Sequence, residues 1–256
     1  MFEARLHQSS FLLKILEAIK ELLNEATFEC TNNGIQLQAM DNSHVSLISL
    51  FLSQGGFDKY KCDRNISLGI NLTSMLKIMK CAGNDDIVTI QTKGDLDSIT
   101  FTFESQNYDK VSNYQLRLMN LDHEHLDIPE TDYACVMKMP SAEFAHIFKT
   151  LLQFGETVEI SCSKDGVKFS TSGDLGKANI KLAPNNITDS DKAIFIEIQE
   201  PVSATFAIRY LTSFAKATPL ALRVQLSLTP DLPLLVQYEM GDKGRLKYFL
   251  APKVDD

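Results

Sequence analysis

The 256-residue sequence contains no tryptophan, few cysteines and no long run of apolar residues. No window approaches the roughly 18 consecutive apolar residues that a membrane-spanning helix needs. The opening stretch MFEARLHQSS also lacks the basic and then apolar pattern of a secretory signal. We therefore expect no membrane partner and a location in the cytosol or nucleus.

The five cysteines are odd in number, widely scattered and without a CxxC pair. This usage is typical of reduced thiols in a reducing compartment, packed for the most part as small apolar side chains.

Motifs of catalysis are also missing. No phosphate-binding loop of the GxxxxGK[ST] or GxGxxG type occurs. The stretch DNSHVS (41–46) contains Asp, Ser and His, but adjacent residues cannot by themselves form a triad, which depends on spatial roles. His123 and His125 lie in the acidic stretch DHEH without a fixed third metal ligand. The sequence therefore predicts no catalytic residue, no metal site and no cofactor.

The chain does contain an internal repeat. The stretch ECTNNGIQLQ (29–38) returns as SCSKDGVKFS (161–170) at an offset of 132, and each copy has the pattern of a β-hairpin. LTSMLK (72–77) returns as LTSFAK (211–216) at an offset of 139. We therefore expect Lys77 and Lys216 to occupy equivalent points, and about seven extra residues near 183–193.

Each half of the sequence predicts the order strand, helix, hairpin, strands, helix, strands. The expected helices cover 9–25, 72–82, 141–154 and 208–218, and Ser9 and Ser141 are suited to cap the first and third. The acidic stretch 119–133 has neither helical nor strand periodicity, which indicates an extended connector. The predicted domains are therefore 1–118 and 134–256, joined by 119–133.

The net charge is −8, yet positive charge gathers on the four expected helices. They carry seven Lys or Arg against four Glu, a net charge of +3, which leaves −11 on the rest of the chain. Each helix has an apolar face, which extends to Leu23 in the first, Ile78 and Met79 in the second and Phe154 in the third. Lysines often do no more than solvate a helix face. Four helices alike in an acidic chain favour a surface that contacts nucleic-acid phosphates without reading bases.

With these features in place, the chain resembles the proliferating cell nuclear antigen family, the eukaryotic sliding clamps, essentially from end to end. The matching motifs are long and specific, and they include LQAMDNSHVSL, YKCDRNISLGINLTSMLKIMKCAGNDD, SCSKDGVKFSTSGDLG and LKYFLAPK. The resemblance implies an α+β DNA-clamp fold of two duplicated domains, each with two helices on the inner face of a ring and β-sheets outside. It also implies a non-enzymatic processivity factor, a homotrimer that encircles duplex DNA without sequence specificity.

The resemblance assigns roles to particular residues. The residues expected to face DNA are Lys14, Lys20, Lys77, Lys80, His146, Lys149, Arg209 and Lys216. A groove for partner peptides is expected from Met40, His44, Val45, Leu47, Leu126, Ile128, Pro129, Leu232, Pro233, Ala251, Pro252 and Lys253. The subunit interface is expected to include Lys110, Tyr114 and Leu116 in the stretch 108–119, and Ala178 and Ile180 in the stretch 174–183. Lys164, in the turn SKDG, matches the family's acceptor for ubiquitin-type modification during damage tolerance.

The partners implied in this way are DNA polymerases, the clamp loader, and nucleases and ligases that carry clamp-interacting peptides, in the nucleus. One alternative stays open: a clamp paralogue specialised for repair or checkpoint signalling, which could assemble in a mixed ring.

Overall fold

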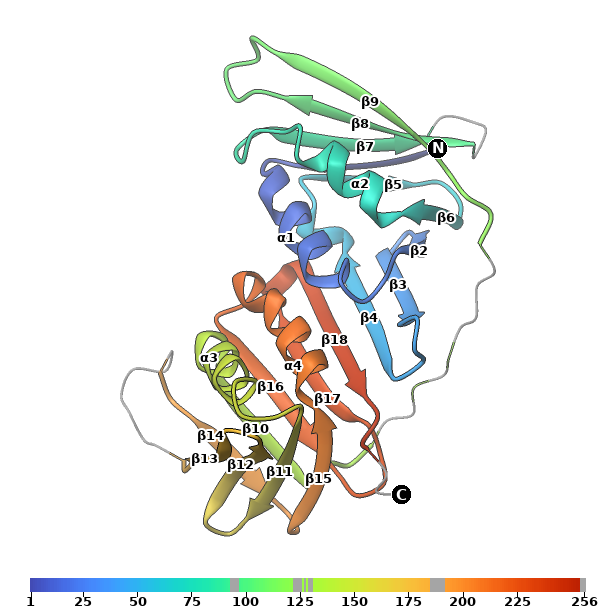
Figure 1. Cartoon of the computed structure of the whole chain (residues 1–256). Helices are drawn as coiled ribbons and strands as arrows, with labels where there is room; N and C mark the ends of the chain where they lie inside the picture. The colour runs from blue at the N-terminus through green and yellow to red at the C-terminus, as the bar shows by residue number, and fades with distance from the viewer. Residues whose placement is uncertain (93–96, 122–125, 127, 129–130, 185–191, 254–256) are drawn as a thin grey trace. The chain divides into compact units, whose positions relative to one another are not determined.

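The computed structural model (Figure 1) describes residues 1–92, 97–121, 126, 128, 131–184 and 192–253. They form two compact units, each built from segments that are distant in the sequence. The first unit contains Met1–Asn42, Ile48–Leu126 and Met240–Leu246, and the second contains Ser43–Leu47, Asp127–Glu239 and Lys247–Asp256.

Two antiparallel sheets and two helices make up the first unit. One sheet has the order β5-β1-β7-β8-β9, with β5 (Lys59–Cys62), β1 (Phe2–Leu6), β7 (Ile87–Thr92), β8 (Ser98–Glu104) and β9 (Val111–Arg117). The other has the order β4-β3-β2-β6, with β4 (Ser46–Ser53), β3 (Gly34–Met40), β2 (Glu25–Thr31) and β6 (Ile66–Asn71). The helices are α1 (Ser9–Ile19) and α2 (Leu72–Met79), and a short 3-10 turn covers Gln54–Gly56.

The second unit repeats this plan strand for strand. One sheet order is β14-β10-β16-β17-β18, with β14 (Phe195–Ile198), β10 (Cys135–Pro140), β16 (Arg223–Leu228), β17 (Leu234–Glu239) and β18 (Gly244–Leu250). The other is β13-β12-β11-β15, with β13 (Gly176–Leu182), β12 (Gly166–Gly173), β11 (Thr157–Ser163) and β15 (Val202–Ala207). Its helices are α3 (Ser141–Leu151) and α4 (Ile208–Phe214), and 3-10 turns cover Ala215–Leu220 and Gly241–Lys243. The expected duplication is confirmed.

The repeated hairpins form as the sequence predicts. Thr31 pairs with Gly34 across the β2–β3 turn, and Ser163 pairs with Gly166 across the β11–β12 turn. Both glycines have a positive φ, and both pack against the next strand of their sheet. A Cβ on Gly34 would lie 2.0 Å from the carbonyl oxygen of Leu52, and one on Gly166 would lie 2.2 Å from that of Leu182. Only glycine fits at these two equivalent positions.

The repeated six-residue phrase, in contrast, is not in structural register. Helix α2 begins at Leu72 and α4 at Ile208, an offset of 136 instead of 139. The LTSMLK phrase thus opens its helix, whereas LTSFAK begins three residues into α4. The structural equivalent of Lys216 is Lys80, so the prediction that pairs it with Lys77 is wrong. A shift of three residues is close to one turn, which keeps both lysines on an outer face.

The first three expected helices are too long at their C-terminal ends. Helix α1 ends at Ile19, whose carbonyl accepts the backbone N–H groups of Leu22 and Leu23, and Glu25 already opens β2. Leu22 and Leu23 are buried in this turn, not on the helix. The second and third helices end at Met79 and Leu151, so the half-buried Phe154 lies beyond its helix. Helix α4 ends at Phe214, but the chain continues as a 3-10 helix to Leu220, past the expected end at 218. In the second helix Leu72 and Leu76 take core positions and Ile78 is half-exposed.

The predicted serine caps are also wrong. Helix α1 is preceded by Gln8 and α3 by Pro140, and neither N-cap makes a side-chain bond. Ser9 lies inside the first turn, where its Oγ donates to the carbonyl oxygen of Gly83 at 2.7 Å. A long-range partner has therefore taken the hydroxyl that the local pattern assigned to the cap. In α2 the cap is Asn71, whose side chain accepts from the backbone N–H of Ser74 at 2.9 Å.

The extra residues of the second half lie where they are expected, between Leu182 at the end of β13 and Phe195 at the start of β14. Twelve residues separate β13 from β14, whereas five separate the equivalent strands β4 and β5, so seven extra residues lie here as expected. The β12–β13 turn is three residues shorter than the β3–β4 loop, so the offset grows only from 132 at the first hairpin to 136 at the second helix. Residues 185–191 of this stretch lie outside the described residues.

Aromatic rings form much of the core beneath the helices of the second unit. Phe144 and Phe148 of α3 lie with ring centroids 4.8 Å apart, and Phe148 meets Phe169 of β12 edge-on at 5.6 Å. Phe214 of α4 stacks on Tyr248 of β18 at 4.4 Å. These contacts fix the helices on the sheets and leave their opposite faces for solvent.

All five cysteines are free, and Cys30, Cys135 and Cys162 are buried. Burial raises the pKa of the Cys30 and Cys62 thiols, which disfavours the reactive thiolate. The expectation of reduced thiols, three of which pack as small apolar side chains, agrees with this arrangement.

Gly34→Ala should lower the free energy of unfolding more than Gly176→Ala. Both glycines have a positive φ, so either alanine costs about 1–2 kcal/mol in backbone strain. Only at Gly34 would the new Cβ also meet backbone atoms, which should add about 1–3 kcal/mol. Denaturant midpoints at one protein concentration measure both variants. Equal losses would contradict crowding at Gly34.

Candidate nucleic-acid interface

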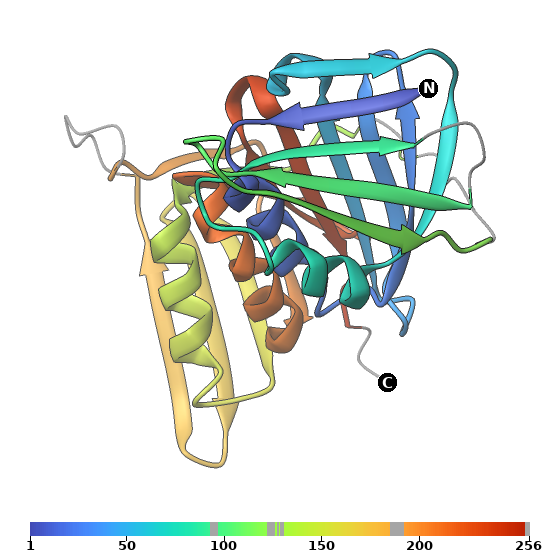
Figure 2. The same cartoon turned by 90° about the horizontal axis from the view of Figure 1, so that it is seen from above.

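The helices of the first unit present lysines on the face turned away from its core. Helices α1 and α2 contact each other and lie side by side in Figures 1 and 2. Lys14 is exposed in the middle of α1, and Lys20 is half-buried at its C-cap. Lys77 and Lys80 are both exposed, at the last turn and the C-cap of α2. Cations at these C-terminal positions also interact favourably with the helix dipole.

The second unit presents its cations in the same way. Helices α3 and α4 contact each other, and the first buries Phe144, Ile147, Phe148 and Leu151. His146 and Lys149 lie on the exposed face of α3. Arg209 is exposed in the first turn of α4, and Lys216 is exposed in the 3-10 turn that follows. The guanidinium of Arg209 lies 5.0 Å from the ring centroid of Tyr210, which restricts its orientation.

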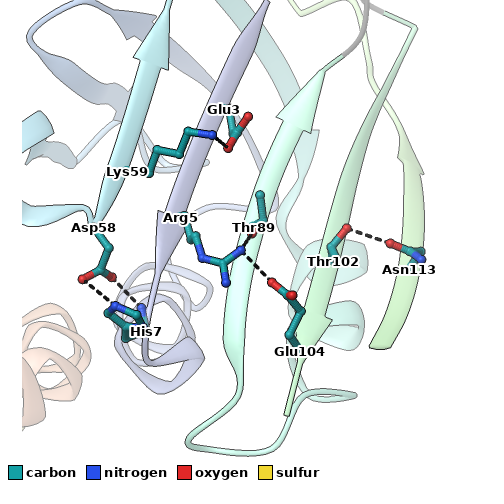
Figure 3. A network of polar contacts seen from close by, with 9 residues as sticks. All are labelled: Glu3, Arg5, His7, Asp58, Lys59, Thr89, Thr102, Glu104 and Asn113. Carbon is teal, nitrogen blue, oxygen red and sulfur yellow. Dashed lines mark hydrogen bonds and ion pairs between the residues drawn. The ribbon is translucent and has the colours of Figure 1, made fainter. Parts of the chain in front are cut away.

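The cations of the helices and those of the sheets differ in whether they form ion pairs. On the five-stranded sheet of the first unit, Arg5 pairs with Glu104 at 2.6 Å and Lys59 with Glu3 at 2.7 Å, as Figure 3 shows. Over the described residues, no ion pair involves the cations of α1, α2 and α3. These cations are Lys14, Lys20, Lys77, Lys80 and Lys149. Their charge is therefore not neutralised locally and contributes to a positive potential over the helices.

This arrangement suits weak contact with phosphates. Flexible, unpaired lysines on helices can displace counterions from a nucleic-acid backbone, and they carry no geometry that reads bases. Within the described ranges, no three His, Cys, Asp or Glu side chains gather where they could hold a metal ion, and His123 and His125 lie outside those ranges. The described helices are also too short or too polar to cross a bilayer.

The expected groove residues of the first unit include Met40 and Leu126. Met40 is half-buried at the end of β3, and Leu126 is 40 % exposed. The side chain of Gln38 fixes the backbone of Leu126 through two hydrogen bonds of 2.7 Å: its Nε2 donates to the carbonyl oxygen and its Oε1 accepts from the N–H. The sequence analysis missed Gln38, because nothing local distinguishes it from Gln36 on the same strand.

The expected groove residues of the second unit include its C-terminal tail. The backbone N–H of Ala251 donates to the carbonyl oxygen of Val45 at 3.0 Å, and that of Lys253 donates to Thr205 at 2.8 Å. Ile128 and Leu232 are 39 % and 40 % exposed. The other candidates are the exposed His44 and Pro233 and the half-buried Leu47 and Pro252. Pro129 lies outside the described residues.

Both stretches expected at the subunit interface contain edge strands. β9 is the last strand of its sheet and β13 the last of its own. Tyr114 of β9 is half-buried against Phe103, with ring centroids 5.6 Å apart, and Leu116 is also half-buried. Lys110 is exposed just before β9, and Ala178 and Ile180 are half-buried on β13. Val111, 56 % exposed, is an apolar edge residue that the sequence analysis missed.

Lys164 lies at the tip of the β11–β12 hairpin and is exposed. The turn is stabilised next to it, because the backbone N–H of Asp165 donates to Ser163 Oγ at 3.4 Å. The lysine amine is therefore accessible on an ordered turn.

Two family models match the chain. The model of the proliferating cell nuclear antigen N-terminal domain matches residues 1–125, and that of the C-terminal domain matches residues 127–253. The chain belongs to the proliferating cell nuclear antigen family. The resemblance seen in the sequence is thereby confirmed, as are the duplicated α+β clamp domains.

Proliferating cell nuclear antigens are sliding clamps, multimeric rings that encircle DNA and act with replication proteins. They are scaffolds without enzymatic activity, so the chain is a clamp subunit and not an enzyme. A clamp must retain DNA and still slide along it. Unpaired lysines on helices, which bind phosphates weakly and read no sequence, suit that requirement.

The double variant Lys77→Glu with Lys149→Glu should reduce clamp-stimulated DNA synthesis by at least about tenfold, because it reverses one helix cation in each unit. The matched variant Lys61→Glu with Lys168→Glu reverses one exposed strand lysine in each unit and should leave the stimulation unchanged. Primer extension by a clamp-dependent polymerase on a loaded template measures both. Equal stimulation by the two variants would contradict the assignment of the helices to DNA.

Proposed function

We propose that the chain forms a homotrimeric ring in the nucleus that carries DNA polymerases, nucleases and ligases on duplex DNA after a clamp loader has closed it. The observation that supports this most strongly is that the strands equivalent to the edge strands β9 and β13 are paired with each other. In the shared strand order β9 corresponds to β18, and β13 corresponds to β4. β18 and β4 are neighbours, and each compact unit contains part of both strands.

Contacts within each unit define that pairing. In the first unit Gly244 packs against the carbonyl oxygen of Phe51, and in the second the N–H of Ala251 donates to Val45. Along the described chain, β9 and β13 have no such neighbour on their outer sides. If β9 of one copy pairs with β13 of the next, the same type of sheet forms between subunits. This contact is heterologous, so copies add head to tail until a ring closes.

The alternative is a specialised paralogue in a mixed ring, which would need a second type of chain to assemble the ring. A single purified chain that assembles alone supports the homotrimer, whereas a chain that stays monomeric at micromolar concentration contradicts it.

Two further roles rest on exposed residues. Ile128 and Leu232, each about two-fifths exposed, suit the apolar anchors of short partner peptides. Lys164, exposed on its ordered turn, suits attachment of ubiquitin-type modifiers. The corresponding functions would be partner docking and damage tolerance by translesion synthesis.

Ile180→Asp should convert the ring to monomers, because it places a carboxylate in the proposed β9–β13 contact. Sizing with light scattering should show about three times the 28.7 kDa chain mass for the unmodified protein and the single mass for the variant. Phe195→Asp is the matched control, because β14 is an edge strand outside the proposed contact. Loss of the ring in both variants, or in neither, would contradict the interface.

Gln38→Ala should weaken binding of a short apolar clamp-binding peptide by about fivefold to tenfold, because it removes both hydrogen bonds that fix Leu126. Gln36→Ala, on the same strand, removes only an exposed bond to Glu29 and should bind the peptide normally. Fluorescence anisotropy with a labelled peptide distinguishes them. Normal binding by the Gln38 variant would show that the connector needs no such support.

A further inference from the structure

The outer face of the strand pair β10–β14 in the second unit is hollowed. A pocket of about 620 Å³ lies against it, and its lining includes Val136, Lys138, Ile194, Phe195, Glu197 and Arg223. β14 is the edge strand of its sheet, so one side of its backbone has no strand neighbour among the described residues. Phe195 on this strand is 53 % exposed. An edge strand with a large exposed ring is open to another chain.

The equivalent edge of the first unit is protected instead. There β5 pairs with β1 so that Lys59 faces Arg5 and Lys61 faces Glu3. The cations are neutralised within the unit, since Lys59 reaches Glu3 at 2.7 Å and Arg5 reaches Glu104 at 2.6 Å (Figure 3). Charged, ion-paired side chains along an edge discourage the addition of another strand.

The same register positions in the second unit hold different side chains. Phe195 takes the place of Lys59, and it faces Lys138, the counterpart of Arg5. Val136 takes the place of Glu3, so the acid that pairs with Lys59 in the first unit has no counterpart at that position, and Glu197, which faces Val136, takes the place of Lys61. In the described part of the chain Lys138 makes no ion pair. The second edge thus has an apolar ring and an unneutralised ammonium where the first has a closed charge network.

Arg223 completes the positive wall of the pocket. Its guanidinium lies 5.1 Å from the ring centroid of Phe195, and its Nη2 donates to the carbonyl oxygens of Ala193 at 2.8 Å and Lys138 at 3.2 Å. The backbone bonds hold the guanidinium in place. The exposed ring therefore lies between two cations on an ordered surface.

We propose that this surface docks an extended, acidic and apolar segment of a partner protein. The segment adds to the free edge of β14, places a carboxylate beside Lys138 and packs an apolar side chain on Phe195 and Val136. Successive side chains of a strand point to opposite faces, so the acid and the apolar residue that share the pocket are two positions apart. Single-stranded nucleic acid fits less well, because Arg223 already covers one face of the Phe195 ring on which a base would stack, and because nucleic acid has no peptide backbone to add to the edge of β14. The proposed ring uses β9 and β13, so it leaves β14 available.

The probe is a fluorescein-labelled eight-residue peptide whose odd positions are in turn aspartate, phenylalanine, aspartate and valine, with threonine at the even positions, so that acid and apolar side chains share one face. It is titrated against the assembled full-length protein by anisotropy. We expect saturable binding that Phe195→Ser and Lys138→Glu each weaken at least tenfold. Lys61→Glu makes the same charge change on the equivalent edge of the first unit and should leave the affinity unchanged. A peptide with lysine in place of aspartate, and one with proline at alternate positions, should not bind.

Hydrogen exchange provides a second measurement that does not depend on the variants. The bound acidic peptide should slow exchange of β14 amides and leave β5 amides as they are. The proposal is overturned if the acidic peptide does not bind, if Lys138→Glu has no effect, or if the lysine peptide binds equally well. Binding of a 20-nucleotide oligothymidylate that Lys138→Glu abolishes, in the absence of peptide binding, would assign the pocket to nucleic acid instead.

Discussion

An antiparallel sheet ends in two edge strands whose backbone N–H and C=O groups must be paired or protected, and this requirement organises the whole chain. The edge of β6 is met by the start of the connector, where the N–H of Met119 donates to Gly69 at 2.8 Å. The equivalent edge of β15 is met by the C-terminal tail, where the N–H of Lys253 donates to Thr205. β4 and β18 are paired. The connector and the tail are therefore equivalent parts of the two repeats. Of the described strands that keep an unpaired side, β9 and β13 are the counterparts of the paired β18 and β4, and we propose that subunits join there.

Charged residues also behave differently on the sheets and on the helices. Acids outnumber bases in the chain as a whole, but on the outer strands they pair with neighbouring cations, as Glu3 and Glu104 do. Helix lysines such as Lys77 and Lys149 have no acid partner among the described residues. An acidic protein can therefore present cationic helices, because short-range pairing neutralises one set of bases and leaves the other to act at longer range.

The sequence was sufficient to predict the features that depend on residues close together in the chain. The hairpins at Gly34 and Gly166 follow from turn chemistry, and the apolar faces of the helices follow from their periodicity. Features that depend on distant residues were missed. Ser9 turns its hydroxyl to Gly83 instead of capping α1, and the backbone N–H of Leu72 reaches the carbonyl of Asn24, which requires the chain to leave the helix before β2. Gln38 supports Leu126 across 88 residues, and no local pattern distinguishes it from other polar strand residues. The repeated phrase misled because a three-residue shift along a helix preserves its faces.

Because the chain contains two repeats of one fold, the residues at equivalent positions can be compared with each other. The two repeats share one strand order, so backbone requirements such as glycine at 34 and 166 are kept in both. A surface that every helix of a ring must contribute should also be kept in both, and Lys80 and Lys216 do occupy equivalent places. A contact with one partner per subunit needs the binding residue in only one of the two repeats. The equivalent residue of the other repeat is then free to change. The hairpin tip carries Lys164 in the second repeat where the first has Asn32, and the outer edge carries Phe195 where the first has Lys59. Because the common backbone accepts different side chains at these positions, the fold itself requires neither of them, and we propose that the two repeats contact different partners there.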